Sequence, residues 1–170
     1  MEILDLLAQE HRVLEDLLRR IERAMKYPRE VACKEWQKAF LVLLPALDRH
    51  EEIETIAFEN PAYQSKKGAR RILREIELQH GKISSLRQET LAALKEVDVP
   101  DLPSLHALIS QLVRRLRDHF VAEETSLWPH YRAAMRGALD KSVKDEIQEK
   151  LRRIKKDAGM TQAAAADYLG

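Results

Sequence analysis

The strongest constraint on the fold is a repeated arrangement of histidine and glutamate on helical stripes that are otherwise apolar. In each copy, one histidine is followed 39 residues later by a His-x-x-x-Glu motif, and the two copies are 69 residues apart. Residues four apart lie on one face of an α-helix. The pattern therefore predicts a duplicated helical hairpin, whose copies contain His11, His50 and Glu54 in the first and His80, His119 and Glu123 in the second.

Apolar residues at helical spacing extend through nearly the whole chain. They predict long helices over about residues 2–25, 32–59, 65–97 and 104–137, with Ser104 as the cap of the fourth and a charged helix over 140–157. Pro45 is expected to bend the second helix. Four long helices with short connections predict an all-α fold, namely an antiparallel up-down-up-down four-helix bundle over residues 1–137. Residues 138–170 are expected to form a C-terminal helical extension.

Charge and composition exclude several classes of protein. The 170 residues include 29 Lys and Arg against 28 Asp and Glu, so the chain lacks the basic excess of a general nucleic-acid binder. The single cysteine, Cys33, excludes an intramolecular disulfide framework and a thiolate metal cluster. The sequence contains neither a long apolar run nor a signal-peptide pattern, so we expect a cytoplasmic protein without a membrane span.

The repeated polar residues predict a metal site. An ionised carboxylate in a bundle core is costly unless it is paired or binds a cation. Imidazoles and carboxylates without thiolate suit iron, manganese or zinc, and four imidazoles disfavour calcium and magnesium. Six ligands for two metals leave open positions, whereas structural zinc sites are normally closed. The predicted metal ligands are His11, His50, Glu54, His80, His119 and Glu123.

The segment His119-Phe-Val-Ala-Glu123-Glu-Thr-Ser-Leu-Trp-Pro129 resembles the H-x-x-x-E-E-x-x-L-[FW]-P signature of the hemerythrin-like (HHE cation-binding) family. Gln9-Glu-His11, Leu78-Gln-His80 and His50-Glu-Glu-Ile-Glu54 resemble its other ligand segments, so the resemblance covers about residues 1–135. It implies a four-helix bundle with two non-haem iron ions, held by the four imidazoles and bridged by Glu54 and Glu123. Members of this family carry or sense oxygen, respond to nitric oxide, repair iron centres or sense iron.

The chain also departs from the family pattern. Oxygen-carrying members have a fifth histidine one turn after the third-helix histidine, where this chain has Ser84. Thr55 replaces the second acid of the Glu-Glu pair in the first copy, and Phe58-Glu-Asn-Pro61 is a loosened form of the motif's ending. Glu51 directly follows His50 and could serve as an accessory ligand, but its direction about 100° away around the helix favours a surface role.

Three functions remain open from the sequence. The first is binding of O₂ or another small diatomic such as NO, for sensing, carriage or an iron or redox response. The second is a diiron peroxidase, oxidase or iron-centre repair enzyme, which is disfavoured because no general acid or base is added beyond the ligands. The third is a structural zinc-binding bundle. A ferritin-like site is rejected because only Glu77-Leu-Gln-His80 forms the Glu-x-x-His motif that such a site needs twice.

Three further features of the sequence are not assigned to the predicted metal site. His106 and His130 are interpreted as surface or supporting histidines. The tail from Thr161 to Gly170 resembles the first helix of a helix-turn-helix unit. We expect no nucleic-acid binding by this chain alone, although a DNA-binding continuation beyond Gly170 would fit the tail. The sequence leaves the oligomeric state open.

Overall fold

The computed structural model describes residues 3–95, 102–135, 148–149 and 152–153. The helix predicted over 140–157 lies outside these residues except at four positions, and the tail after Thr161 lies wholly outside them. All regular structure in the described part is helical. Its elements are α1 (Ile3–Ala24), α2 (Arg29–Phe58), α3 (Pro61–Gln64), α4 (Ala69–Lys95), α5 (Leu102–Ala122), the π-helical turn η1 (Glu123–Leu127) and α6 (Trp128–Ala134).

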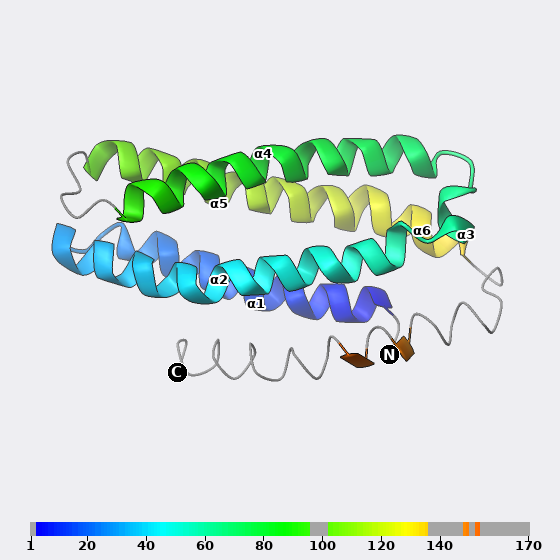
Figure 1. Ribbon diagram of the computed structural model, residues 1–170, viewed down its shortest axis with the longest axis horizontal. Coiled ribbons are helices and arrows are strands. Elements are labelled where there is room, and N and C mark those ends of the chain that lie inside the picture. Colours follow the sequence, from blue (N-terminus) through cyan, green and yellow to red (C-terminus); the bar gives the residue numbers. More distant parts are fainter. Residues whose placement is uncertain (1–2, 96–101, 136–147, 150–151, 154–170) are drawn as a thin grey trace.

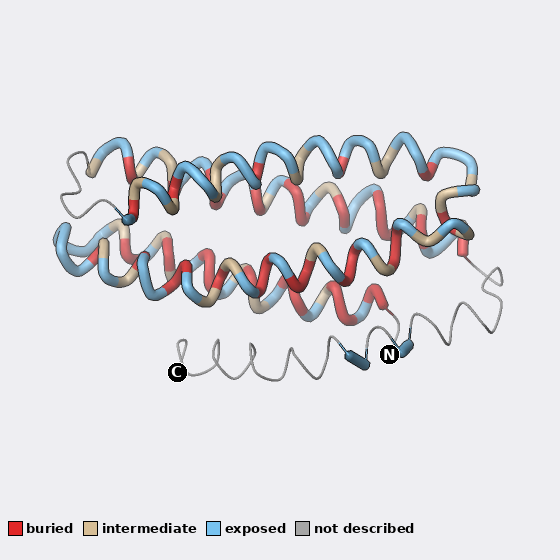
Figure 2. The backbone as a smooth tube through the Cα atoms, in the orientation of Figure 1, coloured by how far each residue is buried: buried red, intermediate tan, exposed pale blue. Residues whose placement is uncertain are grey.

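The helices α1, α2, α4 and α5 lie lengthwise along one another (Figure 1). Helix α1 contacts α2 and α5, and α4 contacts α5 and α2, so each long helix has two long neighbours. Buried positions recur along the faces that these helices turn toward one another (Figure 2). The prediction of an all-helical bundle is therefore confirmed. Within the described ranges, no helix is both long and apolar enough to cross a membrane.

Helix α2 continues on both sides of Pro45. Proline cannot donate to the carbonyl one turn earlier, which here belongs to Leu41. Pro45 is exposed and Leu41 is 77% exposed, so water can hydrate the carbonyl that loses its partner. The helix can therefore tolerate this proline on its solvent side.

Two helix starts differ from the prediction. The third long helix begins at Ala69 rather than near residue 65, because the short α3 and a turn at Gly68 precede it. Gly68 has a φ of 86°, a left-handed conformation that side chains disfavour. The fourth begins at Leu102, so Ser104 lies inside α5 instead of capping it. Pro103 fits there because the first turn of a helix has no internal partner for its missing N–H.

A layer of polar side chains divides the bundle core into two apolar clusters. On α1, Leu7 belongs to one cluster and Leu14 to the other, with His11 between them. On α4, Ile76 and Ile83 flank His80 in the same way. Apolar packing on both sides holds the four helices together across the polar layer, so the fold positions the polar residues without depending on them.

Candidate metal centre

The structure brings all six predicted ligands into this polar layer, and every long helix contributes. Five of the six are buried, while the His80 side chain is 29% exposed. They are His11 on α1, His50 and Glu54 on α2, His80 on α4, His119 on α5, and Glu123 at the start of η1.

One half of the layer is built around His11 and His50, whose Nε2 atoms lie 3.3 Å apart. Oε2 of Glu123 lies 3.0 Å from His11 Nε2 and 3.6 Å from His50 Nε2. Oε1 of Glu54 lies 3.9 Å from His50 Nε2. Two imidazoles and one oxygen from each carboxylate therefore face a common point.

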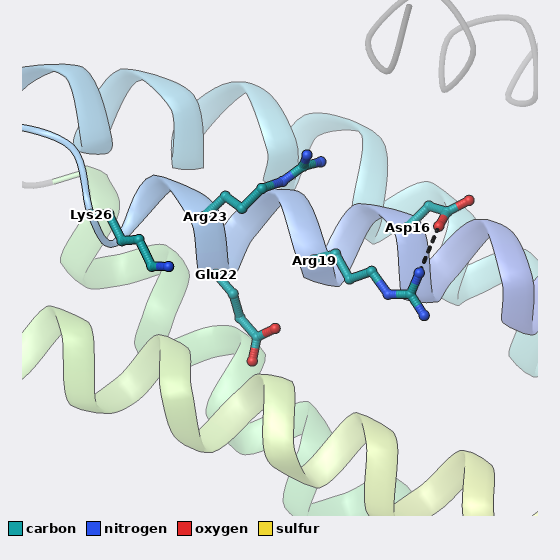
Figure 3. A pocket seen from close by; sticks show the side chains of 5 residues that line it. All are labelled: Asp16, Arg19, Glu22, Arg23 and Lys26. Atoms are coloured by element: carbon teal, nitrogen blue, oxygen red, sulfur yellow. Dashed lines mark ion pairs between the residues drawn. The ribbon is translucent and has the colours of Figure 1, made fainter.

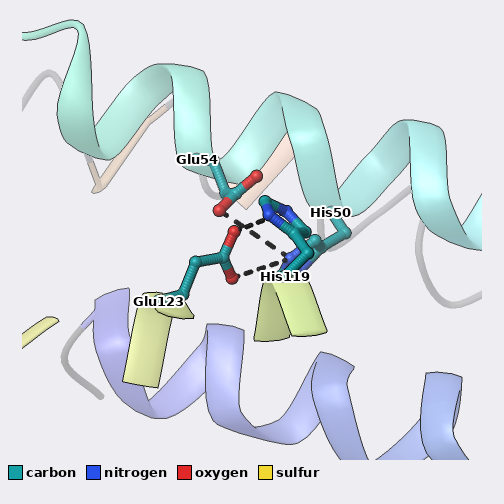
Figure 4. Close-up of side chains that lie close together, drawn as sticks. All are labelled: His50, Glu54, His119 and Glu123. Atoms are coloured by element: carbon teal, nitrogen blue, oxygen red, sulfur yellow. Dashed lines mark ion pairs between the residues drawn. The ribbon is translucent and has the colours of Figure 1, made fainter. Parts of the chain in front are cut away.

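The other half is built around His80 and His119, whose Nε2 atoms lie 2.9 Å apart. Oε2 of Glu54 lies 3.2 Å from His80 Nε2, and Oε1 of Glu123 lies 2.6 Å from His119 Nε2. Each carboxylate thus directs one oxygen to each imidazole pair. Figure 4 shows Glu54 and Glu123 pointing toward each other beside His50 and His119, with one ligand atom from each of the four within 4.8 Å of the others.

The two carboxylates differ in protonation because like charges at this distance cannot both persist in a dry core. Burial and the charge of Glu123 raise the pKa of Glu54 to about 8. Burial would also raise the pKa of Glu123, but hydrogen bonds from imidazoles, first that of His11, hold it well below the ordinary value. Burial lowers the pKa of His50, yet the charges of Glu54 and Glu123 outweigh it and raise that pKa to about 9. In the metal-free layer, protons therefore occupy ligand atoms of His50 and Glu54 that a metal ion would otherwise bind.

Hydrogen bonds within this layer leave some of its polar atoms without a partner, and a bound cation would satisfy the carboxylate oxygens among them. Both oxygens of Glu54 lie within ion-pair distance of an imidazole nitrogen, yet neither accepts a hydrogen bond. Nδ1 of His50 is also buried without a partner. Buried polar atoms in proteins are nearly always satisfied. Divalent ions between the carboxylates and imidazoles would satisfy the oxygens of Glu54.

The π-helical turn η1 begins at Glu123 and orients two successive glutamates toward α1. Adjacent residues of an α-helix point about 100° apart, which would separate their side chains. Here Glu123 approaches Nε2 of His11, and Glu124 Oε1 lies 2.7 Å from Nδ1 of the same ring. Such turns are frequent at functional sites. The sequence analysis assigned no role to Glu124, although its place in the Glu-Glu motif was a signal.

Aromatic rings cover both faces of the His11 imidazole. Phe120 stacks on it with centroids 4.3 Å apart, and Trp128 stacks on it at 4.8 Å. Phe120 directly follows the predicted ligand His119 in the sequence. Ring contacts and the two glutamates leave His11 little freedom to rotate, so its Nε2 lone pair is held toward the centre of the layer.

A second outer contact supports His119. Its Nδ1 lies 3.1 Å from Oε1 of Gln79, on α4. Metal-binding histidines usually donate their other ring N–H to a carboxylate or carbonyl, which fixes the tautomer that binds metal through the opposite nitrogen. His11 and His119 both have such an acceptor, the carboxylate of Glu124 and the amide of Gln79. The sequence analysis did not identify Gln79.

The remaining histidines stay outside the layer, as interpreted from the sequence. His106 packs edge-on against Trp36, with centroids 5.1 Å apart. His130 joins the Tyr63 hydroxyl, 2.9 Å from its Nδ1, to the carbonyl of Lys67, 3.0 Å from its Nε2. His130 therefore holds the turn between α3 and α4.

Two other residues named from the sequence also lie away from the centre of the layer. Arg87 pairs with Glu51 at 3.2 Å, which matches the surface role assigned to Glu51. Ser84, where oxygen-carrying relatives have a histidine, is exposed one turn after His80.

Two pockets lie along α1. One, of about 710 Å³, reaches the centre, since His11, Glu124 and Trp128 contribute to its lining. The other, of about 790 Å³, is lined by acidic and basic side chains of α1 and of the turn that follows it (Figure 3), namely Asp16, Arg19, Glu22, Arg23 and Lys26. Arg19 pairs with Asp16 at 3.8 Å, and Glu22 accepts from Arg117 at 2.8 Å. The second pocket is therefore lined by charged side chains, some of them ion-paired, and no imidazole is among them.

A helical bundle whose core is interrupted by four imidazoles and two carboxylates has the character of a metal-binding bundle. The family model described as the hemerythrin HHE cation binding domain matches residues 71–169. The chain therefore belongs to the hemerythrin HHE cation-binding domain family. The match includes His80, His119 and Glu123, and it begins after the first copy of the repeat. No curated protein and no solved structure matches the chain.

Proposed function

We propose that this protein is a non-haem diiron protein that binds O₂ or another small diatomic such as NO, for sensing, carriage or an iron or redox response. The observation that carries the proposal is the position of two carboxylates across two imidazole pairs, with one oxygen of each directed to each pair. Membership of a cation-binding family supports it independently. The proposal includes an antiparallel up-down-up-down order of the four long helices.

In this proposal, His11 and His50 hold one iron, His80 and His119 hold the other, and Glu54 and Glu123 bridge them. Iron in such a site supplies a position for a small ligand and a change of oxidation state. Six protein ligands are too few to close two iron coordination spheres, so positions stay open for that ligand. The chain's single cysteine, Cys33, packs against the apolar cluster that contains Trp36 and does not belong to the polar layer, so the proposed ligands include no thiolate.

The chain's own side chains orient the ligands and limit water. Phe120 and Trp128 cover the ring of His11, while apolar clusters close the layer on both sides along the bundle. A small apolar molecule can approach through the pocket of about 710 Å³ beside α1. Restricting water around a metal site lowers the local dielectric and protects it from side reactions.

The proposal is tested by reconstituting the full chain with Fe²⁺ without oxygen, measuring iron per chain, and recording optical spectra before and after O₂ or NO. We expect about two irons per chain and new absorption bands that reverse when the gas is removed. Irreversible oxidation with turnover of peroxide or NO would instead favour the diiron enzyme. Tight zinc with no iron uptake would favour the structural bundle and overturn the proposal.

A further inference from the structure

We infer that the two metal positions are unequal: the position between His11 and His50 binds divalent metal tightly, whereas the position between His80 and His119 exchanges with solvent. This inference rests on the proposed two-metal centre. The inference adds that the position between His11 and His50 fills first and that Glu124 determines this order.

The contacts that join the two copies of the repeat match each other closely. Glu123 lies 3.0 Å from His11, and its counterpart Glu54 lies 3.2 Å from His80, the counterpart of His11. The imidazole pairs are separated by 3.3 Å and 2.9 Å. These contacts alone would make the two positions nearly equivalent. The contacts within each copy differ, because His50 lies 3.9 Å from Glu54 whereas its counterpart His119 lies 2.6 Å from Glu123.

The outer contacts break this equivalence. Glu124 accepts from Nδ1 of His11 at 2.7 Å, and the repeat places Thr55 at the position equivalent to Glu124. The Thr55 hydroxyl donates to the carbonyl of Glu51 at 2.9 Å, within its own helix. His80 thus lacks the carboxylate that His11 has. A carboxylate on the outer nitrogen makes an imidazole a stronger metal donor and fixes its orientation.

Solvent exposure differs in the same direction. The side chains of His11 and His50 are 5% and 1% exposed, and aromatic rings stack on both faces of His11. The His80 side chain is 29% exposed. Water can therefore reach His80 and compete for the metal there, whereas the side chains of His11 and His50 are almost wholly withdrawn from solvent.

Two reciprocal substitutions isolate this effect. Glu124→Gln keeps the size of the side chain but removes the charge on the outer nitrogen of His11. Thr55→Glu introduces a carboxylate at the position that the repeat equates with Glu124, here within the regular helix α2. The matched controls are Glu52→Gln, an exposed glutamate of α2, and Thr125→Glu, whose exposed threonine bonds to its own helix as Thr55 does, 2.6 Å from the Val121 carbonyl.

The experiment is an oxygen-free titration of the metal-free full chain with ⁵⁷Fe²⁺ against a competing chelator, followed by Mössbauer spectra at one and two equivalents. We expect two binding steps and one quadrupole doublet at one equivalent, with a second distinct doublet at two. Outer contacts of this kind change metal affinity about 10- to 100-fold. Glu124→Gln should weaken the first step by that factor, and Thr55→Glu should strengthen the second.

Two equal steps in the unchanged protein would overturn the inference and leave the proposed function standing. Equal weakening of both steps by Glu124→Gln would also overturn the inference, because Glu124 would then support both positions equally. Uptake of one iron or none per chain would overturn the proposed two-metal centre itself.

Discussion

His11 and Glu123 are 112 residues apart in the chain, yet His11 Nε2 lies 3.0 Å from Glu123 Oε2. The contact joins the first copy of the repeat to the second, and its counterpart joins Glu54 to His80 at 3.2 Å. Neither copy alone contains the ligands of one complete position. Each proposed metal position therefore takes side chains from both hairpins, so we expect binding of metal to be coupled to their association.

Glu123→Ala should remove at least one metal per chain and most of the rise in unfolding temperature that metal produces. Glu123 directs one oxygen to each imidazole pair, so its loss affects both positions. Metal analysis and thermal unfolding with and without Fe²⁺ test this. Glu51→Ala is the control, since Glu51 pairs with Arg87 near the surface. Full metal content in Glu123→Ala would show that the ligands are wrongly assigned.

Metal should stabilise the protein more as the pH rises from about 6 to about 9. Folding raises the pKa of His50 from 6.5 to about 9 and that of Glu54 from 4.5 to about 8. Both groups therefore stabilise the metal-free fold below their ordinary pKa values, and this stabilisation is lost as the pH rises through the folded values. Metal requires both groups deprotonated, so proton competition declines over the same range.

Unfolding temperatures of the metal-free and metal-bound protein, measured across this pH range, test that prediction. The difference between the two temperatures should increase with pH. A difference that shrinks as the pH rises would contradict the protonation of His50 and Glu54 in the metal-free protein.

Arg49→Met should destabilise the fold by about 3–5 kcal/mol, because it leaves the Glu10 carboxylate buried without its partner. Arg49 donates to Glu10, and the two side chains are only 7% and 1% exposed. The double change Glu10→Gln with Arg49→Met should recover much of the loss, since it leaves no buried charge. Urea unfolding of the metal-free proteins measures both. Equal losses in the single and double variants would contradict this account of the pair.

Ser84→His should tighten metal binding at the position of His80 and change the optical spectrum of the iron-loaded protein. Ser84 lies one turn after His80, on the exposed side of that position, where an added imidazole could replace water. Ser85→His, which adds the same group at an exposed position one residue further along α4, is the control. Identical spectra for Ser84→His and Ser85→His would place residue 84 away from the metal.

The long helices and the six ligand candidates could be predicted because their signals are local. An apolar period near 3.6 residues and a His–Glu spacing of four residues can each be recognised within a single segment of the chain. The start of α4 was placed wrongly because Gly68 changes the chain direction through its positive φ, and helical periodicity does not register such a turn. Ser104 was misjudged as a cap because Pro103 can occupy the first turn of α5.

The outer contacts of the site could not be predicted because they depend on packing between distant elements. Glu124 and His11 are 113 residues apart, and Glu124 makes this contact from the π-helical turn, which sequence periodicity does not reveal. Gln79 reaches His119 only because α4 packs on α5. Sequence spacing therefore predicts the inner ligands, whereas the proposed inequality of the two positions rests on contacts that only the three-dimensional structure provides.

The most direct test of the two-metal centre is iron K-edge X-ray absorption on the full chain loaded with Fe²⁺ without oxygen. The account predicts imidazole scattering and an iron–iron vector of roughly 3.5–4 Å that disappears when Glu54 and Glu123 are both replaced by alanine. Full iron loading without a metal–metal vector in the unchanged protein would contradict a centre bridged by these two carboxylates.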